Sequence, residues 1–359
     1  MFWGISFPRN RIANHSEIGF APGFRTRNWK SEHKSRDDLR PPTCSRDCTS
    51  SIPTRCYNGR MAHQRLIIGC GYLGQRVARN WTAQGDIVFA LTRTAHHAEE
   101  LRQSGITPIV GDVTDGASLA GLPEVDTILW AVGLDRRAGH SQRDVYVGGL
   151  DNVLCRLPRN VRRMIYISST SVYGQNGGEW VDESSECLPE SPNGQVCLDA
   201  ERLLQQKVPP ANILRLAGIY GPGRLVARIE ALRAGQVPEG NPDAWLNLIH
   251  VDDGAAAVLA CERRGAPGAT YLVADGHPCR RREYYSLLAA MVGAPPPFRV
   301  AVNGKQTEQC ETGLAASPQQ SPSTNLNKRC SNGRLRDELQ VALRYSRFNL
   351  GLVNALTTR

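Results

Sequence analysis

The sequence predicts an α/β fold, in which a doubly wound parallel sheet is followed by a smaller C-terminal α/β lobe. From residue 65 onward, short apolar runs alternate with segments of helical periodicity, and each run ends in small or polar residues. Runs that are apolar throughout are typical of strands buried on both faces, as in parallel sheets. The chain has 359 residues, of which 41% are hydrophobic, so it is long enough to bury a large core.

The expected elements alternate regularly up to residue 217 and become shorter and less regular beyond it. Strands are predicted at residues 66–69, 87–91, 107–110, 127–132, 164–168 and 212–216. Helices are predicted at residues 73–84, 95–103, 145–157, 198–206 and 332–343.

The chain divides into an extension and two predicted domains. Residues 1–60 show neither helical nor strand periodicity, so we expect an extension without packed structure; one hypothesis is that it precedes a functional start at Met61. Residues 61–217 are expected to carry the sheet, and residues 218–359 a smaller substrate lobe interleaved with it. Residues 302–324 are rich in Gln, Ser, Thr and Pro and are predicted to form a mobile surface loop.

Composition excludes several classes of function. The net charge is +9, but residues 1–60 hold 11 Lys and Arg against 5 Asp and Glu, so most of the excess lies in the extension. Because no basic helix or aromatic-interleaved strand accompanies this charge, we expect no nucleic-acid partner. No apolar run reaches the roughly 20 residues of a membrane-spanning helix. The 11 cysteines include no C-x-x-C pair, which argues against disulfides and a metal site and favours the reducing cytoplasm.

A glycine-rich turn lies between the first predicted strand and the first predicted helix, where residues 69–74 read G-C-G-Y-L-G. In a G-x-G-x-x-G turn, the first glycine permits the tight turn, the second lets the backbone approach a pyrophosphate, and the third lets helix and strand pack closely. The N-terminus of the helix then faces the phosphates with free N–H groups. The residues that we expect to bind a dinucleotide here are Gly69, Gly71, Tyr72, Leu73 and Gly74.

The end of the second predicted strand bears on the choice between NAD and NADP. An acidic residue at this point would bind the ribose 2′-hydroxyl of NAD, but the sequence has Thr92 and Arg93. Because an arginine can pair with a 2′-phosphate, we predict that NADP(H) is preferred over NAD(H); the alternative is a solvated Arg93. Further contacts are expected from Asp112 and Val113, near the adenine, and from Ala131, near the ribose and nicotinamide.

Several ordered motifs accompany the glycine-rich turn: G-D-V-T-D (111–115), I-S-S-T-S-V-Y-G (167–174), R-L-A-G-I-Y-G-P-G-R (215–224), N-L-I-H-V-D-D (247–253) and N-K-R-C-S-N-G-R-L (327–335). Together they resemble the extended and atypical short-chain dehydrogenase/reductase superfamily, in particular its NAD-dependent epimerase/dehydratase-like proteins. The resemblance covers residues 62–352. It implies a Rossmann-like NAD(P)-binding domain over residues 61–217 and a small-molecule substrate that is often a nucleotide sugar.

The resemblance also implies a set of catalytic positions, which this sequence fills only in part. The superfamily uses a Tyr-x-x-x-Lys pair with a Ser or Thr, usually completed by an Asn. The Ser position falls on Ser169, but the Tyr and Lys positions fall on Asn193 and Cys197, and the Asn position falls on Tyr146. An Asn side chain does not titrate, and a Cys supplies no fixed cation.

Two tyrosines are possible replacements for the missing acid, Tyr146 and Tyr173; the alternative is that both are aromatic packing residues at the wall of the cleft. The resemblance further implies four neighbours of the site, which are Tyr220, Arg224, Asn247 and His250. For His250, a structural hydrogen-bonding role is the stronger interpretation.

Three hypotheses of function remain open at this point, and the third, nucleic-acid binding through the basic residues of segment 1–60, is the least favoured. In the first, the protein is an NADP-dependent oxidoreductase or epimerase that acts on a nucleotide sugar or a small carbonyl compound. In the second, it is a regulatory protein that binds NADP(H) without turnover, because the Tyr-x-x-x-Lys pair is missing.

Overall fold

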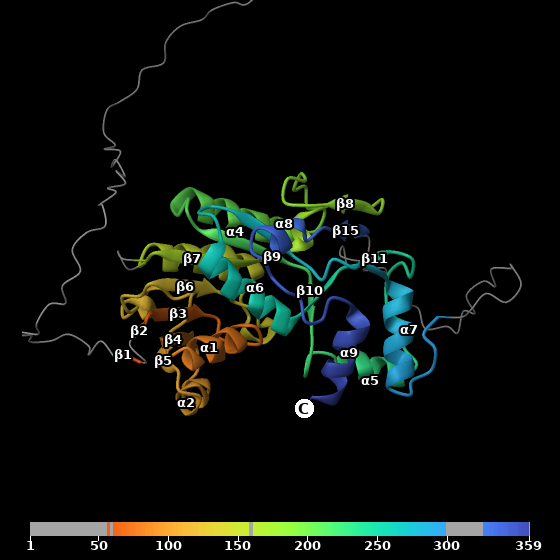
Figure 1. Ribbon diagram of the computed structural model, residues 1–359, viewed down its shortest axis with the longest axis horizontal. Coiled ribbons are helices and arrows are strands. Elements are labelled where there is room, and N and C mark those ends of the chain that lie inside the picture. The colour runs from red at the N-terminus through yellow and green to blue at the C-terminus, as the bar shows by residue number, and fades with distance from the viewer. Residues whose placement is uncertain (1–55, 58–59, 158–160, 299–325, 359) are drawn as a thin grey trace, which may run out of the picture. The chain divides into compact units, whose positions relative to one another are not determined.

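Seven parallel strands form the main sheet of the protein, a computed structural model that describes residues 56–57, 60–157, 161–298 and 326–358 (Figure 1). In sheet order, the strands are β13 (Thr270–Val273), β9 (Asn212–Leu216), β7 (Arg163–Ser169), β6 (Thr127–Trp130), β3 (Gln64–Ile68), β4 (Ile87–Thr92) and β5 (Thr107–Val110). The chain winds from β3 to one edge of the sheet and then back across β3 to the other edge. The predicted doubly wound fold is therefore confirmed.

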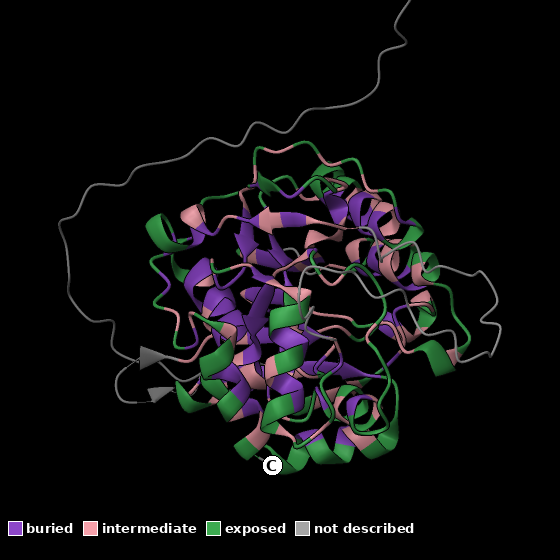
Figure 2. Ribbon diagram, turned by 90° about the vertical axis from the view of Figure 1, so that its right-hand side faces the viewer, coloured by how far each residue is buried: buried purple, intermediate pink, exposed green. Residues whose placement is uncertain are grey.

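Helices cover both faces of this sheet, which explains why its strands are apolar throughout. On one face, Ile67 and Leu129 pack with apolar residues of α1 (Gly74–Ala83) and α6 (Val251–Arg264), and α2 (Ala95–Gln103) adds Leu101. On the other face, alternate strand residues such as Ile128 pack with α3 (Gly149–Leu154) and α4 (Pro192–Lys207). Figure 2 shows this buried middle with the exposed outer sides of the helices around it.

The later part of the chain adds shorter elements and returns β13 to the edge of the main sheet beside β9. Its strands pair as β10 (Gly218–Tyr220) with β12 (Leu248–His250), β11 (Trp245–Leu246) with β14 (Cys279–Arg280), and β8 (Glu179–Val181) with β15 (Lys328–Cys330). Its helices are α5 (Val226–Arg233), α7 (Arg281–Met291), α8 (Gly333–Asp337) and α9 (Phe348–Thr357). Tyr220, Tyr284 and Leu352 belong to the apolar cluster that joins α5, α7 and α9.

Two predicted helices begin differently in the structure. The helix predicted at 198–206 begins at Pro192, because the Ser191 hydroxyl accepts a hydrogen bond from the Gly194 N–H at 3.1 Å and caps the helix. The helix predicted at 145–157 starts as a π-helical turn, Asp144–Gly148, and continues as α3. The earlier start of α4 matters for function because it places Asn193 and Cys197 on the same helix.

The prediction for the C-terminal helix was wrong in length. The segment predicted as a helix at 332–343 is helical only over α8, and Gln340, three residues beyond its end, adopts a left-handed backbone conformation with φ of 52°. The chain then forms α9, which the sequence did not indicate. At the other end, β1 (Cys56–Tyr57) and β2 (Arg60–Met61) form a short hairpin inside the predicted extension. Residues 1–55 and the predicted loop 302–324 lie outside the described residues.

Candidate functional site

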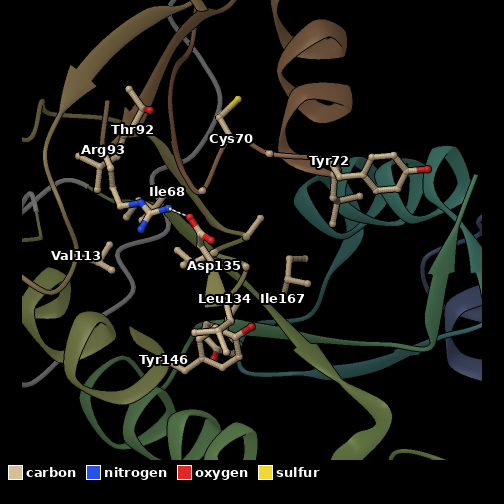
Figure 3. Close-up of a pocket in the computed structure, with 18 of the residues that line it drawn as sticks. Ile68, Cys70, Tyr72, Thr92, Arg93, Val113, Leu134, Asp135, Tyr146 and Ile167 are labelled. Atoms are coloured by element: carbon tan, nitrogen blue, oxygen red, sulfur yellow. Dashed lines mark hydrogen bonds and ion pairs between the residues drawn. The ribbon is translucent and has the colours of Figure 1, made fainter. Parts of the chain in front are cut away.

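A cavity of about 800 Å³ opens at the carboxyl ends of β3, β4, β6 and β7. Ligands of doubly wound folds bind at this end of the sheet, and the volume suits a cofactor-sized ligand. Of the residues named from the sequence, the cavity is lined by Gly69, Gly71, Tyr72, Leu73, Thr92, Arg93, Val113, Ala131, Tyr146, Ser169, Cys197 and Arg224. Figure 3 shows a close-up of this cavity.

The three glycines of the turn have different surroundings. A Cβ atom on Gly69, whose φ is +91°, would lie 2.6 Å from the carbonyl oxygen of Ala131 and the backbone of Val132. A Cβ on Gly74 would lie 2.7 Å from the carbonyl oxygen of Gly69, whereas nothing lies within 4 Å of a Cβ on Gly71. Gly69 and Gly74 are therefore required for packing, and Gly71 leaves open space beside the cavity.

The first turn of α1 points its backbone at the same space. Leu73 is its N-cap, no side chain caps the helix, and its first turn holds no acidic residue. The N–H groups of Gln75 and Arg76 already donate to the carbonyl oxygens of Gly71 and Leu73. The N–H groups before them and the positive end of the helix dipole are available to an anion. Together with the open space at Gly71, this arrangement fits the pyrophosphate of a dinucleotide.

Arg93 reaches across the cavity to a partner that the sequence analysis missed. Its guanidinium Nη2 donates to Asp135 Oδ2 at 2.9 Å, as drawn in Figure 3, and its side chain is 44% exposed. Asp135 also accepts a hydrogen bond from the Arg137 N–H, and this bond, together with Arg93, holds the pKa of its carboxyl below the usual value. Thr94 also lines the cavity; its hydroxyl oxygen accepts from the His97 N–H and caps α2, and its proton is left for another acceptor.

The remaining residues predicted to bind the cofactor take two kinds of position. Thr92, Val113 and Ala131 line the cavity, at the ends of three different strand segments. Asp112 does not line it; its carboxylate instead accepts hydrogen bonds from the N–H and hydroxyl of Thr114, both at 2.8 Å. Asp112 therefore stabilises the turn that presents Val113.

Three side chains from different elements line the cavity near the end of β7, namely Ser169, Tyr146 and Cys197, and Tyr146 packs against the apolar cluster that contains Cys197. The Ser169 hydroxyl accepts a hydrogen bond from the Ser171 N–H at 3.1 Å, and its proton is left for another acceptor. Burial raises the pKa of the Tyr146 phenol and of the Cys197 thiol, so both are protonated near neutral pH. Asn193 is exposed in the first turn of α4 and is not a lining residue.

Tyr173 lies behind this wall in a buried network. Its hydroxyl accepts a hydrogen bond from Arg215 Nη1 at 2.8 Å, and Arg215 pairs with Glu201 at 2.7 Å. The hydroxyl of Ser168, a lining residue, donates to the same Glu201 carboxylate. Burial is the main cause that raises the pKa of Tyr173 well above its usual value. Tyr173 is fully buried and is not among the lining residues, so its position fits a packing role.

Of the four neighbours implied by the resemblance, only Arg224 lines the cavity. Its guanidinium lies over the ring of Tyr72, 5.4 Å from the centroid, while the Tyr72 hydroxyl donates to the carbonyl oxygen of Pro222 at 3.0 Å. These contacts connect the glycine-rich turn to the segment after β10.

The other three neighbours hold the later part of the chain together. His250 is fully buried and caps α6, since its Nδ1 accepts from the Asp252 N–H at 3.2 Å. Asn247 donates to the carbonyl oxygen of Lys328 and accepts from the Cys330 N–H, which fastens β15. Tyr220 is buried in the apolar cluster of α5, α7 and α9.

The sequence analysis missed several lining residues, notably His97, Asp135 and Arg137. All three residues follow soon after the end of a predicted strand, which is a weak indication of a binding site. Only the fold shows which of the segments after the strands lie side by side. Across the described part of the chain, no group of three or more His, Cys, Asp or Glu residues is arranged to hold a metal ion. Within the same residues, no helix is both long and apolar enough to cross a membrane.

Comparison with known proteins decides the family. The family model for the NAD dependent epimerase/dehydratase family matches residues 66–274, which include every strand of the main sheet except β3 in full. The chain belongs to this family. The resemblance seen in the sequence motifs is confirmed, and so is the expectation of an NAD(P)-binding, epimerase/dehydratase-like protein at the level of the family.

Two relatives are similar to more than 60% of this chain. Protein YeeZ of Escherichia coli (strain K12) is 30% identical over 239 residues, which cover 64% of this chain and 84% of YeeZ. A 2-alkyl-3-oxoalkanoate reductase of Stenotrophomonas maltophilia (strain K279a) is 30% identical over 252 residues, which cover 63% of this chain and 74% of the reductase.

Solved structures agree on the fold. A candidate NAD-dependent epimerase/dehydratase from Methylobacillus flagellatus matches with a TM-score of 0.62 and 30% identity, covering 82% of this chain and 97% of that one. The enzyme WbmG of Bordetella bronchiseptica, solved in complex with NAD and UDP, matches with a TM-score of 0.65 and 20% identity, covering 82% of this chain and 94% of that one. At that identity, the second match shows the fold alone.

Proposed function

We propose that this family member is an NADP(H)-dependent reductase of a small carbonyl compound. The observation that carries the proposal is that Ser169, Tyr146 and Cys197 all line the cavity into which the glycine-rich turn opens. The similarity to a 2-alkyl-3-oxoalkanoate reductase supports the same class of reaction.

The cofactor part of the proposal rests on backbone groups and one arginine. The N-terminus of α1 and the open space at Gly71 would hold the pyrophosphate. Arg93 lines the cavity beside Thr92 at the end of β4, where the 2′-phosphate of NADP would lie. When NADP binds, Arg93 would leave its exposed ion pair with Asp135 and form a charge-assisted hydrogen bond to the phosphate. This bond would favour NADP(H) over NAD(H).

The chemistry proposed for the chain's own residues is proton donation. The bound cofactor would supply the hydride to the carbonyl carbon. Ser169 would donate a hydrogen bond to the carbonyl oxygen, and Tyr146 would give its proton to that oxygen as it becomes an alcohol and recover one from solvent. Because burial raises the pKa of Tyr146, the phenol stays protonated near neutral pH and holds the proton that this step transfers.

A second candidate function is binding of NADP(H) without turnover. Its specific support is Cys197, which lies at the cavity wall where the superfamily's lysine is expected. Burial raises the pKa of this thiol, so it carries no charge near neutral pH and cannot replace a fixed cation. In this case, the cofactor site would report the redox state of NADP to a partner.

One experiment separates the two candidates. Purified protein is titrated with NADPH, NADP, NADH and NAD by calorimetry and is then mixed with NADPH and a panel of 3-oxo acids, their esters and nucleotide sugars while NADPH absorbance is followed. The reductase proposal expects NADPH consumption with at least one 3-oxo compound. Tight NADPH binding with no consumption across the panel would support the second candidate instead.

Variants assign the proton donor. Tyr146→Phe is expected to lower kcat by roughly 10²- to 10⁴-fold with NADPH affinity unchanged, and Ser169→Ala is expected to lower kcat as well. Tyr173→Phe is the matched control, because it removes the same hydroxyl from a tyrosine that does not line the cavity. Equal losses in the two tyrosine variants would contradict the assignment of Tyr146.

A further inference from the structure

Two charged residues of the loop after β6, Asp135 and Arg137, line the cofactor cavity, although no motif of the sequence points to them. Arg136 stands between them in the chain and does not line the cavity. The cofactor site described under the proposed function uses one cation, Arg93 at the end of β4, and assigns no role to Arg137.

The carboxylate of Asp135 lies between these two arginines, and Figure 3 draws its pair with Arg93. Oδ2 accepts a hydrogen bond from Nη2 of Arg93 at 2.9 Å. Oδ1 accepts one from the Arg137 N–H at 3.0 Å and lies 3.6 Å from Nε of the Arg137 guanidinium. The bond from the Arg137 N–H and the one from Arg93 hold the pKa of the Asp135 carboxyl below its usual value, so it is ionised near neutral pH. The chain therefore already holds one anion at this place in the cavity.

A ligand can reach all three side chains. The exposed fraction of the side chain is 44% for Arg93, 35% for Asp135 and 96% for Arg137. Among the described residues, Asp135 is the only carboxylate that forms an ion pair with either arginine. Exposed ion pairs of this kind are weak, so an anion that binds the two arginines more strongly can displace Asp135 toward solvent.

A phosphate monoester is such an anion. Near pH 7 it carries about 1.5 to 2 negative charges and offers three acceptor oxygens, whereas a carboxylate carries one charge and offers two oxygens. Arginine binds phosphate through paired, charge-assisted hydrogen bonds. A third donor is at hand in Thr94, which follows Arg93, lines the same cavity and keeps its hydroxyl proton free when it caps α2.

We propose that Arg137 is a second specificity-determining residue for NADP(H), which binds the 2′-phosphate together with Arg93 once Asp135 has been displaced. The inference rests on the cofactor preference of the proposed function. The 2′-phosphate competes with an internal carboxylate for the same two arginines. NADH has no 2′-phosphate, so it leaves the pair between Arg93 and Asp135 in place and gains nothing from Arg137.

Calorimetry with two fragments of the cofactor tests this site without the nicotinamide and without turnover. Adenosine 2′,5′-bisphosphate should bind at least about tenfold more tightly than 5′-AMP, because only the former carries the 2′-phosphate. Arg137→Ala keeps the backbone N–H that holds Asp135. This variant should bind NADPH and the bisphosphate roughly five- to tenfold more weakly, with NADH and 5′-AMP changed less than about twofold.

Arg136→Ala is the matched control. It removes the same charge from the neighbouring exposed residue, which does not line the cavity, so NADPH affinity should change less than about twofold. Equal losses in the two variants would show that only the general charge of the loop matters and would overturn the proposal. NADH binding measures whether each variant is folded.

A double variant separates direct contact with the phosphate from an effect through Asp135. In the Asp135→Asn background, Arg137 has no carboxylate to hold, so a role that passes through Asp135 is abolished. Arg137→Ala should still weaken NADPH binding roughly fivefold in this background. An unchanged NADPH affinity there would overturn the proposal.

The unmodified protein distinguishes failure of this inference from failure of the proposed function. If it prefers NADPH over NADH and Arg137→Ala keeps the full preference, the role of Arg137 is wrong and the proposed cofactor stands. If the unmodified protein binds NADPH and NADH equally, both the cofactor preference and the role of Arg137 are wrong.

Discussion

In the half of the cofactor cavity that contains the glycine-rich turn, a ligand would be bound by the backbone. The features that allow this are the open space at Gly71 and the N-terminus of α1, which no side chain caps. In the half near β7 and α4, the groups that would act on a ligand are the side chains of Ser169, Tyr146 and Cys197. The first half matches its sequence motif in every required position, whereas the second has lost the superfamily's Tyr-x-x-x-Lys pair. Binding through backbone groups depends on a few glycines, but proton transfer depends on the identity of each side chain.

Among the changes in the half near β7 and α4, substitution of Glu201 is expected to have the largest effect on stability. Glu201→Ala leaves the charge of Arg215 buried without its partner, so we expect a loss of about 3–5 kcal/mol in the free energy of unfolding. A thermal melt should show a drop on the order of 10 °C. The double variant Glu201→Leu with Arg215→Leu should recover most of this loss, because it removes both charges. A double variant no more stable than the single one would show that packing, not the unpaired charge, is the cause.

The glycines allow packing and binding to be separated in the first half. Gly69→Ala places a Cβ against backbone at 2.6 Å in a left-handed conformation, so both stability and NADPH binding should fall, the latter roughly 100-fold or about 3 kcal/mol. Gly71→Ala meets nothing within 4 Å, so its melting temperature should stay unchanged while NADPH binding weakens. Calorimetry and a melt on each variant check the contrast. Normal binding by Gly71→Ala would mean that the pyrophosphate does not approach this residue.

Arg93 tests the preference for NADP. Arg93→Ala should cost roughly 1.5–3 kcal/mol of NADPH binding and leave NADH binding nearly unchanged. Asp135→Asn is the matched change on the other side of the ion pair; it frees Arg93 and should raise NADPH affinity several-fold. Titrations of both variants with NADPH and NADH measure the effect. An unmodified protein that binds both cofactors equally would contradict the role given to Arg93.

Removal of residues 1–60 is expected to have the smallest effect. The cut removes β1 and Arg60 of the short β1–β2 hairpin, but this hairpin is not part of the main sheet, which begins with β3 at Gln64. A chain that starts at Met61 should melt at the same temperature as the full chain and bind NADPH equally well. A loss of several degrees would show that the extension contributes to the fold.

Local patterns explain where prediction from sequence succeeded and where it failed. Helix α2 and strands β5 and β9 have the predicted bounds, because their apolar periods end at residues that stop the element. The start of α4 was missed although Ser191 and Pro192 are a recognisable cap. The end of α8 at Asp337 was missed, because no glycine or proline follows the helix directly.

The sequence by itself determined the fold class, the glycine-rich turn and the family, because each depends on residues that are close together in the chain. Only the tertiary structure decided that Arg93 pairs with Asp135 and that Tyr173 is buried against Arg215 while Tyr146 lines the cavity. These arrangements join residues that lie tens of positions apart. Their energies come from burial and from hydrogen bonds between distant segments, so no local pattern encodes them.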